Sequence, residues 1–407
     1  MKRALSVLLT AAMAASMMAG CGSSSDGAAS GTTTDNGAAA GTESAGAAAA
    51  DGAAFKIGGI GPTTGAAAIY GTAVMNGAQI AVDEINAAGG INGYQIDYNF
   101  QDDEHDAEKA VNAYNKLKDS GMQILMGTVT STPCKAVKDN AHDDNMFLLT
   151  PSGSAVECTK YDNAFRICFN NPDQGTASAR YIKENSLATK VAAVYDSSDV
   201  YSSGIYEKFA AECKAEGIEV VESQAFTSDN KSDFSVALQK IKDSGAELVF
   251  LPIYYQEAAL ILKQADTAGL DVKFFGCDGL DGVISQLKDD AALANGVMLL
   301  TPFAADAKDD KTVKFTAAYK AAYNDETPDQ FAADGYDAVY TIKAALEKAN
   351  VTDANISASD LCNKLKAVMT EITVDGVTGS MTWNAEGEPT KEPKAMYIQD
   401  GAYKAMD

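Results

Sequence analysis

The segment from Gly127 to Ser154, GTVTSTPCKAVKDNAHDDNMFLLTPSGS, limits the fold of this chain more than any other part. An apolar run ends at Gly127, a Ser/Thr turn follows, and Pro133 opens a helical segment. Residues 146–149 then form a second apolar run that leads to another polar turn. A strand, a helix and a second strand in this order are typical of a parallel sheet, whose strands end at one ligand-binding edge. We therefore expect both polar turns to lie at such an edge.

Three serine hydroxyls in these turns are candidate ligand-binding groups: those of Ser131, Ser152 and Ser154. The N-terminus of the helix between the strands adds free N–H groups and partial positive charge, which suit a carboxylate or a phosphate. The alternative is that each serine only caps a helix, because serine is common at N-caps. The pattern alone leaves both interpretations open, and the first hypothesis is a small anionic or zwitterionic ligand.

The overall charge argues against one class of partner. The chain has 407 residues and a formal net charge of -24, and 46% of its residues are hydrophobic. This length and apolar content predict a globular protein with two domains of ordinary size. Because phosphate binding needs a basic surface, we do not expect nucleic acid as a partner.

The seven cysteines do not form a metal-binding pattern, because no CxxC pair occurs in the sequence. We therefore expect no metal. In an oxidising compartment Cys158 and Cys168 could close a short loop. Apart from Cys21, the cysteines are Cys134, Cys158, Cys168, Cys213, Cys277 and Cys362, and the sequence leaves their pairing open.

Residues 1–20 are typical of a secretory signal peptide, with two basic residues before an uncharged apolar run that is short for a membrane span. The residues Met18 to Cys21 resemble the lipobox of bacterial lipoproteins, which predicts that Cys21 is lipidated after cleavage. An ordinary cleaved leader is the alternative. Residues 22–54 are almost entirely Gly, Ala, Ser, Thr and Asp. Residues 21–54 are therefore expected to be the lipidated cysteine and a flexible tether with a reach on the order of 30 Å.

From Phe55 onward, segments with the apolar pattern of strands alternate with segments that have the three-to-four spacing of helices. Strands are expected at 55–60, 96–100, 124–126, 146–149, 191–195, 219–226, 247–253, 273–275 and 395–399. Helices are expected near 74–85, 107–117, 202–215, 232–244, 256–268, 309–323, 334–348 and 357–369, and one more begins at 133. This alternation predicts an α/β fold with mostly parallel sheets, in two lobes joined by more than one crossover. The loop Gly59–Gly65 lacks the glycine spacing of a dinucleotide site, so no cofactor is expected.

The chain from Phe55 onward resembles the substrate-binding proteins of branched-chain amino acid ABC transporters, which are type I periplasmic binding proteins of the Leu/Ile/Val-binding family. The matching stretches, in the same order, are GPTTGAAAIYGTAVMNGAQIAVDEINAAGGINGYQI, the segment Gly127–Ser154, NNPDQGTASARYI, YDSSDVYSSG, GLDVKFFGCDG, DGYDAVY and GSMTWNAEGE. The resemblance implies two Venus-flytrap lobes, each a mostly parallel sheet flanked by helices. Lobe 1 would comprise residues 55–171 and 302–392, and lobe 2 residues 172–301 and 393–407, with hinges near 171–172, 301–302 and 391–394.

The resemblance also assigns expected roles to polar residues. Ser131, Ser152 and Ser154 stand where the family holds the α-carboxylate of an amino acid and shares in holding its ammonium group. Asp278 stands where the family has a glutamate that meets the ammonium group, and it is one methylene shorter. The alternative for Asp278 is an ordinary Asp-Gly turn.

Three tyrosines complete the expected ligand-binding set: Tyr70, Tyr201 and Tyr254. Tyrosine combines apolar area with a hydroxyl, which suits the aliphatic part of an amino acid. The alternative is that each tyrosine only packs at the base of a loop, since the chain contains 17 of them.

The function implied by the resemblance is that of an extracytoplasmic lipoprotein, anchored to the bacterial cell membrane by lipid alone. It would act as a monomer, bind a branched-chain or related amino acid, and deliver it to the permease subunits of an ABC importer. A sensory receptor of the same fold and a binder of short amides or urea are the alternatives.

An enzyme is not expected. The only histidines, His105 and His142, occur in acidic segments that predict solvated helix surface, and the chain lacks the serine hydrolase, P-loop and zinc-protease motifs.

Overall fold

The computed structural model describes residues 52–406 of the chain. The expected signal peptide, the expected lipidation site Cys21 and nearly all of the expected tether lie outside the described residues.

The first sheet has five parallel strands in the order β2-β1-β3-β4-β5. They are β1 (Ala54–Gly61), β2 (Gln95–Asp102), β3 (Ile124–Gly127), β4 (Phe147–Thr150) and β5 (Ala164–Arg166). Strands β3 and β4 are buried along their whole length, as expected for parallel strands that are covered on both faces.

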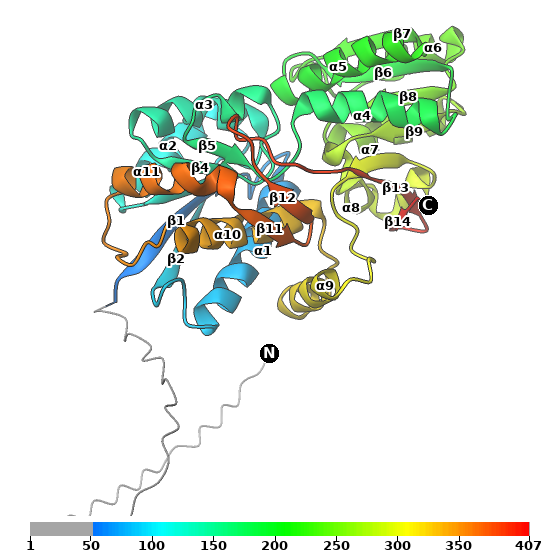
Figure 1. The fold of residues 1–407 in the computed structure, drawn as a ribbon. Coiled ribbons are helices and arrows are strands. Elements are labelled where there is room, and N and C mark those ends of the chain that lie inside the picture. Colours follow the sequence, from blue (N-terminus) through cyan, green and yellow to red (C-terminus); the bar gives the residue numbers. More distant parts are fainter. Residues whose placement is uncertain (1–51, 407) are drawn as a thin grey trace, which may run out of the picture. The chain divides into compact units, whose positions relative to one another are not determined.

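Helices cover both faces of this first sheet, and together with the sheet they form the first lobe (Figure 1). The helices are α2 (Ala107–Asp119) and α3 (Ser131–Asp143) on one face, and α1 (Ala68–Ala87), α10 (Gln330–Lys348) and α11 (Ala358–Val368) on the other. Three smaller elements complete the lobe: the 3₁₀ helices η1 (Val156–Thr159) and η4 (Met369–Glu371), and the antiparallel hairpin of β11 (Thr373–Gly376) and β12 (Gly379–Thr382).

The second sheet has seven strands in the order β14-β13-β10-β9-β8-β6-β7. They are β6 (Lys190–Asp196), β7 (Glu219–Phe226), β8 (Leu248–Leu251), β9 (Lys273–Gly276), β10 (Met298–Thr301), β13 (Lys394–Gln399) and β14 (Ala402–Ala405). The first five are parallel, whereas β13 and β14 each run antiparallel to a neighbour.

The helices of the second lobe also lie on both faces of its sheet. They are α4 (Asn171–Glu184) and α5 (Val200–Glu216) on one face, and α6 (Ser235–Ser244) and α7 (Tyr255–Thr267) on the other. The short segments η2 (Asp278–Leu280), α8 (Val283–Leu287) and η3 (Lys288–Ala294) link β9 to β10, and α9 (Asp310–Ala322) follows β10.

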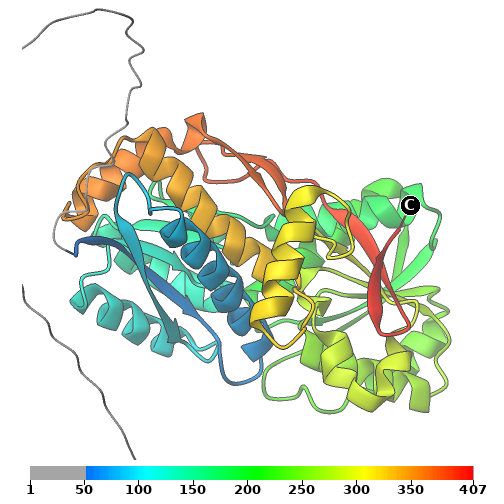
Figure 2. The same ribbon diagram turned by 90° about the horizontal axis from the view of Figure 1, so that it is seen from below.

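The α1–α10 pair is the closest helix contact in the first lobe, and Figure 2 shows the two helices side by side. Glycine permits this approach. A Cβ atom on Gly77 would lie 1.9 Å from the Ala332 carbonyl oxygen, and one on Gly335 would lie 2.3 Å from the Val74 oxygen. Both helices start at the same end of the sheet, so their first turns bring Tyr70 and Phe331 together.

Two details of the sequence interpretation need correction. Helix α3 begins at Ser131 rather than Pro133. Proline is tolerated there because the N–H groups of a first helical turn have no intrahelical partner. The suggested disulfide between Cys158 and Cys168 is not formed, since all six cysteines within residues 52–406 are buried free thiols.

The described part of the chain was also searched for membrane spans. No helix within residues 52–406 is both long and apolar enough to cross a membrane.

Candidate ligand-binding site

A buried pocket lies between the two lobes, where strands of both sheets end. The space not filled by atoms there, including space open to solvent, is about 230 Å³. Its lining residues are Tyr70, Val129, Thr130, Ser131, Ser152, Tyr201, Tyr254, Asp278, Gly279 and Phe331. Six of the seven residues expected to bind ligand therefore line one pocket. The seventh, Ser154, is buried behind it.

Ser131 starts α3, and its hydroxyl oxygen is held by the second polar turn. It accepts hydrogen bonds from the backbone N–H groups of Ser154 at 3.2 Å and Ala155 at 3.1 Å. Its oxygen also lies 3.4 Å from Ser154 Oγ. Both lone pairs of the Ser131 hydroxyl are thereby used, so its proton can go either to Ser154 Oγ or to a ligand. The capping interpretation does not fit Ser131, because the N-cap of α3 is Thr130.

Ser152 has the opposite polarity. Its hydroxyl donates to the Val129 carbonyl oxygen at 2.6 Å, so it can present only lone pairs to the pocket. Thr150 fixes the two turns to each other, because its hydroxyl donates to the Thr128 oxygen at 2.6 Å and accepts from Gly153 N at 2.7 Å. The two turns therefore form one rigid edge of the first lobe.

Arg166 supports this edge from behind. Its fully buried guanidinium group donates to the carbonyl oxygens of Gly153 and Ala155, each at 3.0 Å. Glu388 lies 3.1 Å from the same guanidinium group and balances its charge. A buried charge needs such a partner, and the network holds the second turn in place.

Asp278 supplies the negative charge of the site from the second lobe. It is 4% exposed and begins η2, so the Asp-Gly segment is turn-like while its carboxylate lines the pocket. The Tyr201 hydroxyl donates to Asp278 Oδ1 at 2.6 Å, and Gln174 Nε2 donates to Oδ2 at 3.1 Å. Burial raises the pKa of Asp278 to about 6, and the hydrogen bonds from Tyr201, Gln174 and Gly279 act against that rise.

Aromatic rings form the walls of the pocket. The rings of Tyr201 and Tyr254 stack with centroids 4.9 Å apart, and those of Tyr70 and Phe331 lie 4.4 Å apart. The Tyr70 hydroxyl donates to the Gly279 oxygen at 2.6 Å and accepts from Tyr255 N at 3.0 Å. Burial raises the pKa of Tyr70, which keeps this hydroxyl protonated. Tyr70, on α1, thus connects the two lobes directly.

Three further hydrogen bonds join the lobes. Thr132 Oγ1 donates to Asp199 Oδ1 at 3.1 Å. On the other side of the pocket, Gln330 N donates to Asp281 Oδ2 at 3.2 Å, and Gln330 Nε2 donates to the Asp278 carbonyl oxygen at 3.0 Å. The first residue of α10 therefore contacts the loop that carries Asp278.

The sequence interpretation of His105 was wrong. His105 is half-buried, its ring packs edge-to-face against Tyr254 with centroids 5.3 Å apart, and its Nδ1 lies 2.9 Å from Thr130 Oγ1. Burial lowers the pKa of His105. The acidic neighbours in sequence did predict solvation correctly for His142, which is exposed and stacks on Tyr161.

Sequence reasoning missed Gln174, Gln330 and Phe331. Gln174 lies within the NNPDQGTASARYI stretch, so the only available signal was the resemblance. Gln330 and Phe331 begin a helix that the sequence pattern placed four residues later, and nothing in that pattern pointed to the pocket.

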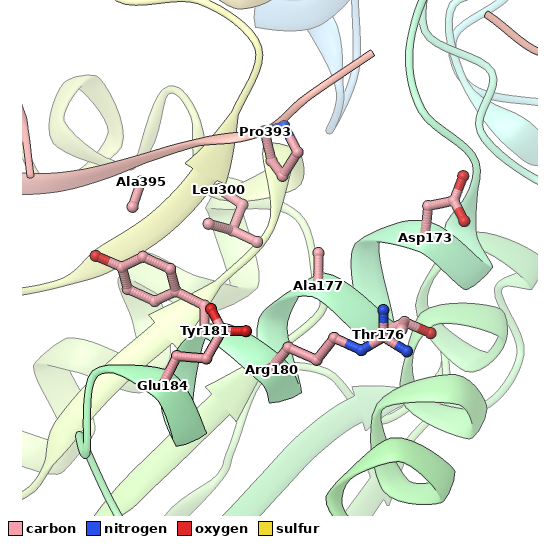
Figure 3. A pocket seen from close by; sticks show the side chains of 9 residues that line it. All are labelled: Asp173, Thr176, Ala177, Arg180, Tyr181, Glu184, Leu300, Pro393 and Ala395. Atoms are coloured by element: carbon pink, nitrogen blue, oxygen red, sulfur yellow. The ribbon is translucent and has the colours of Figure 1, made fainter. Parts of the chain in front are cut away.

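A second, more open hollow lies between α4 and the strands β10 and β13 (Figure 3). Its empty volume is about 780 Å³, and its lining residues are Asp173, Thr176, Ala177, Arg180, Tyr181, Glu184, Leu300, Pro393 and Ala395. It is larger than the buried pocket, but Arg180 is already paired with Glu212 at 2.7 Å and no set of polar groups converges on the hollow. We therefore assign the ligand site to the smaller pocket. Within residues 52–406, no three His, Cys, Asp or Glu side chains are grouped as metal ligands.

Known proteins share this architecture. The family model for periplasmic binding protein matches residues 54–402. The leucine-, isoleucine-, valine-, threonine- and alanine-binding protein of Pseudomonas aeruginosa is 30% identical over 335 residues, which are 82% of this chain and 86% of that protein. The chain belongs to the periplasmic binding protein family.

Solved structures of other periplasmic binding proteins have the same fold. The branched-chain amino acid transporter substrate-binding protein LivJ from Streptococcus pneumoniae, in complex with isoleucine, has a TM-score of 0.78 and 30% identity, covering 87% of this chain and 99% of that chain. A solute-binding protein from R. palustris in complex with benzoate has a TM-score of 0.77 and covers 87% of this chain and 95% of that one. At 23% identity, that likeness concerns the fold alone.

These findings confirm the predicted type I periplasmic binding protein fold and the resemblance to branched-chain amino acid ABC transporter binding proteins. Membership of the family places this periplasmic binding protein outside the cytoplasm.

Proposed function

We propose that the protein binds a zwitterionic amino acid, branched-chain or closely related, between its lobes and delivers it to the permease subunits of an ABC importer, without catalysing a reaction. The observation that carries this proposal is the buried Asp278 carboxylate, which shares one small pocket with the hydroxyls of Ser131 and Ser152.

The hydrogen-bond directions support a zwitterion. Ser131 has a proton to donate, and it lies at the N-terminus of α3, so this side of the pocket suits a carboxylate. Asp278 and Ser152 offer acceptors, which suit an ammonium group. Val129 and the aromatic rings would contact the aliphatic side chain. Ser154, behind Ser131, would hold the Ser131 hydroxyl in place through its backbone N–H.

The relatives support the same ligand class. The Pseudomonas aeruginosa protein is named for binding five amino acids, and the Streptococcus pneumoniae structure contains isoleucine. The fold also accepts benzoate in the R. palustris protein, an anion without an ammonium group. In this chain such a ligand would face the Asp278 carboxylate, and two like charges in a buried pocket repel each other.

A melting-temperature panel tests the proposal. Purified protein is heated with each of the twenty amino acids, short amides, urea and benzoate. A ligand at 100 times its dissociation constant adds about 2.7 kcal/mol to the free energy of unfolding, which gives a clear shift. We expect the largest shift with leucine, isoleucine or valine. A shift with urea or amides alone would favour the uncharged-ligand alternative, and a shift with benzoate alone would contradict the role of Asp278.

The lobe boundaries belong to this proposal. Residues 55–171 with 302–392 would move as one body and residues 172–301 with 393–407 as the other, hinged at the three crossovers, in a monomeric protein. A ligand held by both lobes favours the closed form to the extent that it binds that form more tightly.

We also propose that Cys21 carries the lipid anchor at the outer side of the cell membrane, with residues 22–54 as tether. Cells are grown with labelled palmitate, and the membrane fraction is compared for wild type and Cys21→Ala. The variant should lose the label and leave the membrane fraction. If it kept both, the lipoprotein proposal would be wrong.

A further inference from the structure

We infer that Gln174 is a positioning residue for ligand binding, because its side-chain amide holds the Asp278 carboxylate in the orientation that receives the ligand's ammonium group. The inference rests on the proposed function and deepens it. It adds a residue that does not line the pocket.

Gln174 makes two hydrogen bonds to one residue. It is the fourth residue of α4, directly after the crossover between the lobes, and it is 2% exposed. Its Nε2 lies 3.1 Å from Asp278 Oδ2, and its Oε1 accepts from Asp278 N at 3.4 Å. The reverse orientation of the amide would place oxygen against carboxylate and N–H against N–H. The chemistry of its partner therefore fixes which way the amide lies.

Together with Tyr201, Gln174 leaves each carboxylate oxygen of Asp278 with one donor. Tyr201 bonds to Oδ1 and Gln174 to Oδ2. A carboxylate oxygen accepts about two hydrogen bonds, so one position on each oxygen remains for an ammonium group. Rotation of the carboxylate would break both bonds. The Tyr201 hydroxyl oxygen itself accepts a hydrogen bond from Gly279 N at 2.9 Å.

The charge of Asp278 depends on the same contacts. Burial raises its pKa to about 6, and the bond from Gln174 is one of those that oppose the rise. The other titratable groups near Asp278 are Asp281, whose charge disfavours ionisation of Asp278, and five groups whose pKa values burial raises: Tyr70, Tyr201, Tyr254, Cys277 and Asp334. Without Gln174, the carboxylate would be less ionised at neutral pH as well as less ordered.

Gln174→Met tests the inference, because methionine has a similar length and no donor. Gln239→Met, on the exposed side of α6, is the matched control.

The first measurement needs no ligand. The side-chain carboxyl carbon of Asp278, identified by its absence in Asp278→Asn, is followed by NMR from pH 4 to 8. Wild type and control should titrate near pH 6. Gln174→Met should titrate at least about half a unit higher.

The second measurement is titration calorimetry with L-leucine from pH 5 to 8.5. At pH 7 Gln174→Met should bind roughly tenfold more weakly than wild type, and the loss should narrow toward pH 8.5 as Asp278 ionises. Thermal unfolding checks that the variant is folded, and Gln174→Ala is the second variant if methionine does not fit. An unchanged Asp278 titration in a folded variant would overturn the inference. If wild type bound no amino acid, the proposed function would fail, and the carboxyl titration would still decide the role of Gln174.

Discussion

At the scale of residues, serine serves the site in two ways, as a hydrogen-bond donor at one position and as an acceptor at another. The Ser131 hydroxyl accepts hydrogen bonds from two backbone N–H groups and must donate its proton elsewhere. The Ser152 hydroxyl donates its proton to the Val129 carbonyl oxygen. The backbone around each serine therefore determines which end of a zwitterion it can meet.

The first prediction compares the two ends of the ligand. Asp278→Ala should cost about 2–5 kcal/mol of binding free energy, because the ammonium group would be buried without a charged partner. Ser131→Ala should cost only about 0.5–1.5 kcal/mol, because it frees the N–H groups of Ser154 and Ala155 to bind the carboxylate. Titration calorimetry with the best ligand of the panel measures both, with the exposed Asp271→Ala as control. Equal binding by Asp278→Ala and wild type would reduce Asp278 to a turn residue.

The second prediction concerns pH. The carboxyl group of Asp278 has a pKa of about 6, and its ionised form attracts the ammonium group. Affinity for an amino acid should therefore be full above pH 7 and fall by up to about tenfold per pH unit as pH drops below the pKa. Calorimetry from pH 4.5 to 8 measures the profile. Asp278→Asn should bind weakly with a flatter profile, and a flat profile in wild type would argue against an ionised Asp278 as the ammonium partner.

How much of the site the sequence predicts differs from residue to residue. The two serine-bearing turns were predictable because neighbouring parallel strands end at one edge. Gln330 and Phe331 were not, because only the docking of α10 on α1 places Phe331 in the pocket and Gln330 against the loop of Asp278. His105 was misjudged for a similar reason. Its sequence neighbours are acidic, but the opposite lobe places Tyr254 against its ring.

At the scale of elements, the α1–α10 pair sets the geometry of the first lobe's side of the pocket. Its two glycines, Gly77 and Gly335, allow backbone and backbone to touch. Side chains at these positions would separate the helices whose first turns carry Tyr70 and Phe331.

The third prediction follows from this contact. Gly77→Ala would place a Cβ atom 1.9 Å from the Ala332 oxygen, and a backbone atom cannot move aside as a flexible side chain can. We expect a loss of about 1–3 kcal/mol in the free energy of unfolding, measured by urea denaturation. Asn76→Ala, one residue earlier on α1, is the control. An unchanged unfolding midpoint would mean that the helix pair adjusts freely.

The order of the elements was largely predictable, whereas the short ones were not. Alternating strand and helix patterns gave the parallel parts of both sheets. The hairpin β11–β12 and the strand β14 contain polar residues, glycine and alanine, and they lack the unbroken apolar runs that mark the equally short β3 and β4. Whether two cysteines pair depends on tertiary packing, and their spacing along the chain does not predict that the six described cysteines stay free.

At the scale of the whole molecule, the proposed closure would depend on direct contacts between the lobes as well as on the ligand. The Asp281 carboxylate of the second lobe accepts a hydrogen bond from the backbone N–H of Gln330, the first residue of α10. The helix dipole favours a carboxylate at this position. Tyr70 adds two more hydrogen bonds between the lobes, and Thr132 adds one.

The fourth prediction separates closure from recognition. Asp281→Ala removes a contact of the closed form, so it should weaken binding of every ligand by a similar factor, on the order of tenfold. Calorimetry with leucine and with valine measures the two factors, and Asp289→Ala on exposed η3 is the control. Small-angle scattering should show a smaller radius of gyration with ligand in wild type and a smaller change in Asp281→Ala. If the variant lost clearly more affinity for one of the two ligands than for the other, Asp281 would take part in recognising the ligand.

The α1–α10 contact also bears on how the protein is made. Tyr336 of α10 bonds to Glu84 of α1, 252 residues away along the chain. At about 5–20 residues per second, a ribosome needs roughly 10–50 seconds to synthesise that interval. Throughout this time α1 has no α10 to cover it, whereas strands β6, β7, β8 and β9 have all their strand neighbours within one continuous stretch, residues 190–301. The parallel part of the second sheet can therefore form before the first lobe is complete. The delay would keep the leading portion of the chain from folding early, which is the state required by export pathways that thread unfolded polypeptide.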